Sequence, residues 1–311
     1  MSELSAFRNR LVKNNRHWKK WARRRGISCF RLYDRDIPEF PWAIDWYQGH
    51  VHAQEFARQG QDAFTGDEQL AFTDTLCSVL EIEPTKLALK TRQRQRGSDQ
   101  YQKTGRQGEE MVVEESGLKF LINLHRYLDT GLFIDHRQTR QMVRERAQNK
   151  RVLNLFAYTG SFSVYAAAGG ARESVTVDLS NTYQAWSRRN FELNGMDLEQ
   201  HQLIRADVLV YLAQLVRQRQ LFDIIVMDPP SFSNSKRMEN NLDVQRDHSG
   251  LIHNCLKLLR PSGSLFFSNN LRRFKLDAAI EQAYSCENIT AKTIPEDFKR
   301  HRPHQCWLIK P

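Results

Sequence analysis

The 311-residue sequence lacks several features that would place it in familiar classes of protein. No run approaches the roughly 18 apolar residues that cross a bilayer, and the first 20 residues lack the apolar core of a signal peptide. The five cysteines are scattered and include no CxxC pair, which predicts neither a disulfide framework nor a zinc site. We therefore expect a cytoplasmic protein with reduced thiols, no metal ion and no membrane partner.

Acidic residues are scarce in two segments that hold much of the basic charge. Residues 1–25 carry nine Lys or Arg against one acidic residue, and residues 86–106 carry seven against one. Their combined charge exceeds the net charge of +10, so the rest of the chain is net acidic. Charge segregated in this way predicts a surface that faces a polyanion, whereas a solvated basic face without a partner is the alternative.

The N-terminal part, residues 1–128, is predicted to be a small α+β domain. It opens with a basic amphipathic helix that Gly26 ends. Gln48-Gly49 and Ser116-Gly117 are two-residue hairpin signals between β-like segments. The predicted helices lie at 4–25 and 62–80, and the predicted strands at 27–34, 43–47, 50–56, 86–92, 111–115 and 118–124.

The C-terminal part, residues 129–311, alternates apolar strands with amphipathic helices, which predicts a parallel sheet covered on both faces. Its last 24 residues read as two strands with a polar connection and no helix between them. A sheet that ends in such an antiparallel hairpin is typical of class I S-adenosylmethionine methyltransferases, which are α/β proteins with a Rossmann-like seven-stranded sheet. The predicted strands are 151–156, 174–178, 201–207, 222–228 and 263–269, and the helices are 161–171, 181–195, 208–220 and about 242–259.

The ends of the first strands carry residues suited to a cofactor. Gly160 allows the backbone to approach a ligand. The sequence has no G-x-G-x-x-G pattern here, which disfavours a loop that binds a pyrophosphate. Asp178 follows 18 residues later, near the spacing of a carboxylate that accepts hydrogen bonds from ribose hydroxyls. Asp207 and Asp228 end the next strands, as candidates for the adenine amino group and for the methionine ammonium or the substrate. Helix capping is the alternative for each of the three taken alone.

Two prolines and an aromatic residue follow Asp228. Pro229 and Pro230 cannot continue a central strand and fix a rigid turn. Phe232 is then expected to expose a ring beside the transferred methyl group, where it can stack on a base taken out of its helix. The alternative is a loop that only ends the strand, with Phe232 packed in the core.

Four segments together carry a resemblance to a known family: "LFIDHRQTR" (132–140), "NLFAYTGSFSVYAAAGGA" (154–171), "VTVDLS" (175–180) and "MDPPSFSNSK" (227–236). They resemble the bacterial large-subunit rRNA methyltransferases that carry an N-terminal RNA-binding module. The resemblance is greatest to the guanine-N7-methylating, C-terminal half of the bifunctional RlmKL-type 23S rRNA methyltransferases. "NRHWKKWARR" and "FRLYDRDIPEFPWAID" extend it over most of the chain.

The resemblance implies S-adenosyl-L-methionine as the cofactor and 23S rRNA, or an assembling large ribosomal subunit, as the partner. The residues implied for the cofactor are Phe156, Tyr158, Thr159, Gly160, Asp178, Leu179, Asp207, Val208 and Asp228, with Asp135 and Arg137 bordering the pocket unless they form an internal salt bridge. The residues expected to contact RNA phosphates are Arg16, Lys19, Lys20, Arg23, Arg24, Arg25, Arg92, Arg94 and Arg96.

Cysteine is also missing from the end of the fifth strand, where related cytosine-C5 enzymes carry their nucleophile and this chain has Asn269. Methylation at C5 requires a thiolate that attacks C6, whereas guanine N7 has an available lone pair and no proton. We therefore predict direct methyl transfer to guanine N7 of 23S rRNA. A cytosine-C5 or guanine-N2 enzyme and a non-catalytic assembly factor are the alternatives. The predicted catalytic residues are Asp228, Pro229, Pro230, Phe232 and Asn269.

Overall fold

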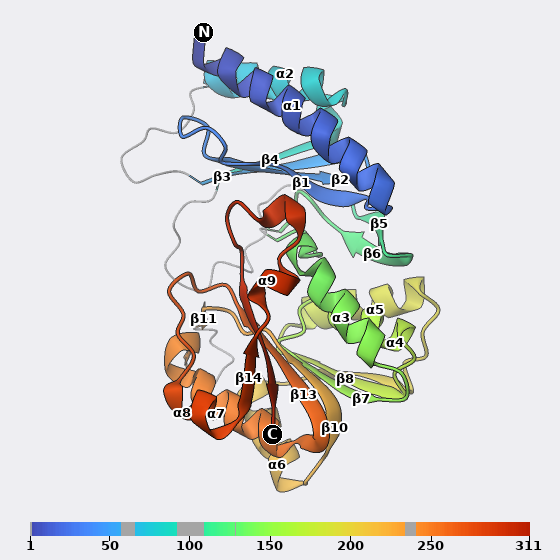
Figure 1. Cartoon of the computed structure of the whole chain (residues 1–311). Coiled ribbons are helices and arrows are strands. Elements are labelled where there is room, and N and C mark those ends of the chain that lie inside the picture. The colour runs from blue at the N-terminus through green and yellow to red at the C-terminus, as the bar shows by residue number, and fades with distance from the viewer. Residues whose placement is uncertain (1, 57–65, 92–108, 128, 234–240) are drawn as a thin grey trace. The chain divides into compact units, whose positions relative to one another are not determined.

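The computed structural model describes residues 2–56, 66–91, 109–127, 129–233 and 241–311 (Figure 1). In these ranges no helix is long and apolar enough to cross a membrane. The chain divides into two compact units. The first contains residues 1–117, 122–130 and 296–301, and the second contains residues 118–121, 131–295 and 302–311.

The first unit is built on a four-stranded sheet in the order β1-β2-β3-β4. The first three strands are antiparallel and β4 runs parallel to β3. Gln48 and Gly49, which join β2 to β3, both have positive φ, as the predicted hairpin turn requires. The strands are β1 (Cys29–Asp34), β2 (Trp42–Tyr47), β3 (His50–Glu55) and β4 (Leu87–Thr91), and the short helix η1 (Pro84–Lys86) precedes the last of them.

Helices α1 (Ser2–Arg25) and α2 (Gly66–Leu80) pack apolar side chains into the core of this unit. Phe7 of α1 is fully buried, and its ring stacks on Phe40 and lies 5.0 Å from the ring of Phe72 of α2. The predicted basic amphipathic helix is thus confirmed, and it ends at Arg25, directly before Gly26, whose φ is 63°. Strands β5 (Met111–Glu115) and β6 (Leu118–Ile122) flank the predicted turn, whose two residues also have positive φ.

The second unit contains a seven-stranded sheet in the order β14-β15-β13-β10-β7-β8-β9. Six strands run in the same direction, and β15 runs antiparallel between β13 and β14. This confirms the predicted Rossmann-like sheet of class I methyltransferases. The strands are β7 (Arg151–Leu155), β8 (Glu173–Asp178), β9 (His201–Arg205), β10 (Phe222–Met227), β13 (Leu259–Asn269), β14 (Ser285–Asn288) and β15 (Gln305–Lys310).

Helices cover both faces of this sheet (Figure 1). Along β10 the side chains alternate between two cores: Ile225 and Met227 pack in one, Ile224 and Val226 in the other. A strand buried on both faces explains the continuous apolar runs in the sequence. One face carries α3 (Arg137–Arg146), α4 (Ser161–Ala168) and α5 (Asn181–Leu193), and the other carries α6 (Val208–Arg217), α7 (Val244–Lys257) and α8 (Ala278–Ala283).

The prediction for the C-terminal segment was partly wrong. The antiparallel pair exists, but its first strand, β14, lies upstream of the "ITAKTI" run (289–294). Two short helices, α9 (Thr290–Thr293) and η4 (Glu296–Phe298), follow β14. Asn288 Oδ1 accepts a hydrogen bond from the Thr290 amide (3.0 Å), and Thr293 Oγ1 donates to the Thr290 carbonyl (3.0 Å). These local bonds offset the preference of β-branched residues for a strand.

We expect Gly169→Ala to destabilise the protein. A Cβ at Gly169 would lie 2.2 Å from the carbonyl oxygen of Arg144, so the backbones of α3 and α4 would have to separate. Forced overpacking of this kind costs about 1–3 kcal/mol, which urea unfolding would measure. Gly250→Ala in α7 is the matched control, because its Cβ meets nothing within 4 Å and the helix should gain about 0.5–1 kcal/mol. Equal stability of the two variants would contradict the expectation.

Candidate active site

The loop that follows β7 has an unusual backbone. Phe156, Tyr158 and Gly160 all have positive φ, at 57°, 53° and 73°. For the two non-glycine residues this conformation costs on the order of 1–3 kcal/mol each and persists only where surrounding contacts enforce it. Such strain is common where a loop must present its backbone to a ligand.

Helix α5 and the neighbouring strand enforce that conformation. Ser187 Oγ donates a hydrogen bond to the Tyr158 carbonyl (3.2 Å), and Asn190 Nδ2 donates to the Thr159 carbonyl (2.9 Å). A Cβ on Gly160 would lie 2.9 Å from Ser187 Oγ, so both the φ and the close packing require glycine. The loop is therefore rigidly held from the side of α5.

Asp178, the last residue of β8, lies against this loop. Its Oδ2 accepts a hydrogen bond from the Tyr158 amide (2.9 Å), and its Oδ1 accepts one from the Ser180 amide (2.8 Å). Burial raises the pKa of the Asp178 carboxyl to about 6, although these backbone donors act in the opposite direction. Each oxygen retains a lone pair for a further donor. Leu179, which follows, is partly exposed.

Asp207 lies two residues beyond β9 and is the N-cap of α6. Its Oδ1 accepts a hydrogen bond from the Leu209 amide (2.9 Å), so the capping alternative is part of its role. Its Oδ2 is buried and has no hydrogen-bond partner among the described residues. An unpaired buried acceptor costs roughly 1–3 kcal/mol, which a ligand that donates a hydrogen bond would recover. Val208 beside it is buried at the start of the helix.

Asp228 follows β10 directly, and its side chain is 28% exposed. Ser268 Oγ donates a hydrogen bond to its Oδ1 (2.6 Å), and Nε2 of His136 lies 3.6 Å from its Oδ2. Pro229 is buried and Pro230 partly exposed, which fits the predicted rigid turn. The carboxylate is thus supported from behind and open to solvent in front.

The remaining predicted catalytic residues differ in exposure. Phe232 is 49% exposed in β11 (Phe232–Ser233), a strand that pairs with β12 (Leu242–Asp243), so the alternative of a core position is wrong. Asn269 at the end of β13 is fully buried. Its Oδ1 accepts a hydrogen bond from the Leu271 amide (3.1 Å), and its Nδ2 has no partner in the described part of the chain.

Asp135 belongs to the short helix η3 (Ile134–His136), and Arg137 begins α3. His304 Nδ1 donates a hydrogen bond to Asp135 Oδ2 (3.0 Å). Three residues near Asp228 or Asp135 were missed by sequence reasoning: His136, Ser268 and His304. His136 stands in a segment that carries the family resemblance, whereas no spacing connects His304 to a residue 168 positions upstream.

The predicted RNA-binding residues of α1 fall into two groups. Arg16, Lys20, Arg23 and Arg24 are exposed. Lys19 instead lies 4.4 Å from the centre of the Trp46 ring, and Arg25, although exposed, pairs with Glu296 (3.3 Å). The first group therefore provides the available charge. The other predicted residues, Arg92, Arg94 and Arg96, lie outside the described residues.

The carboxyl ends of β8, β9 and β10 meet at one edge of the sheet, where open α/β sheets bind ligands. The groups gathered there are acceptors, including the unpaired Oδ2 of Asp207. S-adenosylmethionine offers matching donors in its ribose hydroxyls, adenine amino group and ammonium. The residues present therefore fit this cofactor.

Comparisons with known proteins agree with this geometry. A model of the S-adenosylmethionine-dependent methyltransferase family matches residues 33–299. The ribosomal RNA large subunit methyltransferase K of Neisseria meningitidis is 50% identical over 318 residues, covering 100% of this chain and 88% of the relative. The ribosomal RNA large subunit methyltransferase K/L of Hahella chejuensis is 49% identical over 311 residues, and the match spans 99% of this chain but only 43% of that longer protein.

A solved structure shares the fold. The crystal structure of SMU.776, described as a methyltransferase complexed with SAH, has a TM-score of 0.80 and 25% sequence identity. The match covers 99% of this chain and 82% of the other. Because the family model spans most of the chain and the Neisseria relative is half identical along its whole length, this protein belongs to the S-adenosylmethionine-dependent methyltransferases and uses S-adenosylmethionine as its cofactor.

Proposed function

We propose that this protein methylates 23S rRNA at N7 of a guanine by direct transfer. The observation that carries the proposal is the protonation state of the one thiol described near Asp228, that of Cys306. Cys306 faces Ser268 across β13 and β15, so a cysteine does lie close to the strand end. Burial, and then the charge of Asp228, raise the pKa of this thiol well above its usual range. A thiol held in its neutral form is a poor nucleophile, which disfavours covalent attack on cytosine.

The names of the relatives point to the same class of substrate. The relatives from Neisseria meningitidis and Hahella chejuensis are ribosomal RNA large subunit methyltransferases. The basic face of α1 supports this, because exposed Lys and Arg at helical spacing suit a phosphate backbone. RNA is thus the polyanion that best accounts for the segregated charge.

The cofactor supplies an electrophilic methyl group, and the chain supplies alignment. We assign the ribose hydroxyls to Asp178, because its carboxylate keeps lone pairs after accepting two backbone amides. The adenine amino group is assigned to the unpaired Oδ2 of Asp207. The loop from Phe156 to Gly160 would form the wall between them, with Asp135 and Arg137 at its border.

The target base is assigned from the groups around Asp228. The exposed ring of Phe232 suits stacking on a base. The Hoogsteen edge of guanine presents two acceptors, N7 and O6, and the unpaired Nδ2 of Asn269 is a donor that matches O6. N7 needs no general base, so alignment alone can lower the barrier by several kcal/mol, up to about 7–11 in favourable cases. Asp228 would orient the base or the ammonium group.

The central prediction concerns the product. Incubation of rRNA with the protein and labelled cofactor should yield 7-methylguanosine in the digested nucleosides, measured by mass spectrometry. Asp228→Ala should abolish the transfer because the alignment is lost, while RNA binding persists. Cys306→Ser should remain active, since no covalent step uses the thiol. Appearance of 5-methylcytidine or 2-methylguanosine instead would contradict the N7 assignment.

A pair of variants at Asp207 separates capping from cofactor binding. Asp207→Asn retains an oxygen for the Leu209 amide but replaces the unpaired acceptor with a donor. We expect its affinity for S-adenosylmethionine, measured by calorimetry, to fall about tenfold or more at nearly unchanged stability. Asp207→Ala should lose that affinity and about 1 kcal/mol of stability as well. Full affinity in Asp207→Asn would exclude the assigned contact.

The basic face of α1 gives a further prediction. Replacing Arg16, Lys20 and Arg23 by Gln should weaken RNA binding and reduce the slope of log affinity against log salt by about 2–3. Cofactor affinity should not change. The matched control replaces three exposed basic residues of the other unit, Arg217, Arg219 and Lys257. Equal loss of RNA affinity in both triple variants would mean that net charge, rather than this face, determines binding.

A further inference from the structure

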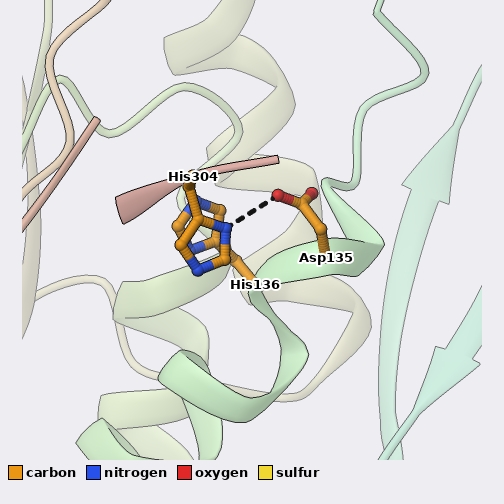
Figure 2. A group of neighbouring side chains, drawn as sticks. All are labelled: Asp135, His136 and His304. Atoms are coloured by element: carbon orange, nitrogen blue, oxygen red, sulfur yellow. Dashed lines mark hydrogen bonds and ion pairs between the residues drawn. The ribbon is translucent and has the colours of Figure 1, made fainter. Parts of the chain in front are cut away.

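A cluster of buried polar side chains lies directly behind Asp228. The imidazole rings of His136 and His304 stack with centroids 4.0 Å apart and an angle of 12° between their planes. Figure 2 shows the two rings one above the other, with the Asp135 carboxylate bonded to Nδ1 of His304. Both histidines are almost completely buried. Burying polar groups so deep in the protein costs free energy unless hydrogen bonds replace those lost to water.

The carboxylate and the two rings bring one ligand atom each within 4.8 Å of one another, a spacing that a metal ion can bridge. The stacking disfavours that use. The lone pair of an imidazole lies in the plane of its ring, so two parallel rings direct their lone pairs side by side rather than toward one ion. The arrangement suits a hydrogen-bonded support better than a metal centre.

His304 is fixed at both nitrogens. Nδ1 bonds Asp135 (3.0 Å), and Nε2 lies 3.1 Å from Thr293 Oγ1. Thr293 Oγ1 also lies 3.0 Å from the Thr290 carbonyl, so this threonine connects the ring to α9. A ring held in this way provides a rigid surface for the ring stacked upon it.

His136 has a polar neighbour at each of its ring nitrogens. Its Nδ1 lies 3.4 Å from Thr139 Oγ1, and its Nε2 lies 3.6 Å from Asp228 Oδ2. Burial, and then His304, lower the pKa of His136 to about 4, so the ring carries a single N–H at physiological pH. A carboxylate can only accept, whereas a hydroxyl can donate to Nδ1. The favoured tautomer therefore places the proton on Nε2, facing Asp228.

We propose that His136 is a positioning residue for Asp228: its neutral ring, held by the stack on His304 and by Thr139, directs Nε2–H at the carboxylate and fixes the orientation of that carboxylate. The inference rests on the proposed function, in which Asp228 aligns the reacting groups. Ser268 holds the other oxygen, so the two supports together determine the plane of the carboxylate.

A neutral support has a physical advantage in this reaction. The cofactor carries a sulfonium and an ammonium, and a guanine methylated at N7 is a cation. Lys or Arg beside Asp228 would neutralise its charge and repel these groups, whereas a neutral N–H orients the carboxylate and leaves its charge intact. Burial of His136 is thus part of the proposed role, because it suppresses protonation.

Kinetics of variants test the proposal. His136→Leu should lower methyl transfer about tenfold to a hundredfold, acting on whichever parameter Asp228→Asn affects, kcat or cofactor affinity. In a double-mutant cycle the His136→Leu/Asp228→Asn protein should be no slower than Asp228→Asn alone. Thr139→Val should also lower the rate, and Thr139→Ser should restore it. His253→Leu, at an exposed histidine, is the control and should keep full activity.

A spectroscopic measurement provides a readout that does not need the reaction. Long-range proton–nitrogen NMR of ¹⁵N-histidine-labelled protein should show His136 neutral with its proton on Nε2 between pH 6 and 9. The His136→Gln spectrum assigns the signal. A proton on Nδ1, a charged ring, or additive effects in the double-mutant cycle would overturn the proposal. So would a stoichiometric divalent ion, detected by elemental analysis, that is lost in His304→Gln.

The outcomes separate the two proposals. If the wild-type protein transfers no methyl group to rRNA, the proposed function fails, while the NMR spectrum still decides the state of His136. If the wild type is active and the cycle is additive, only the positioning role fails. Unchanged activity in His136→Leu, with Asp228→Asn impaired, likewise refutes the role of His136 and leaves the function intact.

Discussion

The site depends on one constraint: polar groups at the carboxyl edge of a sheet buried on both faces must be satisfied either by the protein or by a ligand. At that edge the chain places Asp178, Asp207 and Asp228 at or just beyond the ends of successive strands. Backbone amides satisfy only part of each of the first two carboxylates, and Asp207 Oδ2 has no partner among the described residues. The burial that completes the core thus also leaves acceptors that a cofactor rich in donors can occupy, and it raises the pKa of Asp178 into a range where protonation competes with binding.

The cofactor and the RNA substrate carry charges of opposite sign. A cationic cofactor requires an acidic or neutral pocket, and burial keeps both His136 and Cys306 uncharged there. A polyanionic substrate requires basic groups, and the exposed face of α1 in the first unit provides them. In the proposed function, the segregated charge of the sequence lets one chain bind a cation and a polyanion.

Much of the fold could be predicted because it is determined by patterns of residues that are close in sequence. Alternating strands and helices, and paired positive-φ turns such as Gln48-Gly49, depend on residues close in sequence. The prediction failed for the segment after Asn288, where a side-chain bond to the Thr290 amide starts a helical turn that propensity does not reveal. His304 was missed for a different reason, because its proposed role depends on packing against His136, which lies in a distant segment of the chain. Strand ends are local features, but the groups that support them from behind are tertiary ones.

This distinction explains why the target atom is harder to derive than the cofactor. In the proposed site, the cofactor is recognised by acidic residues at strand ends, which are visible in the sequence. The choice of atom depends on the ionisation of groups nearby. Cys306 lies near enough to Asp228 to feel its charge, and that same charge, together with burial, keeps it a thiol. The Leu271 amide engages Oδ1 of Asn269, so Nδ2 is the polar atom of this side chain that has no partner among the described residues. With the thiol protonated and a donor left over, chemistry at a basic ring nitrogen requires less of this site than chemistry at carbon, because alignment is what the rigid loop, Ser268 and His136 can provide.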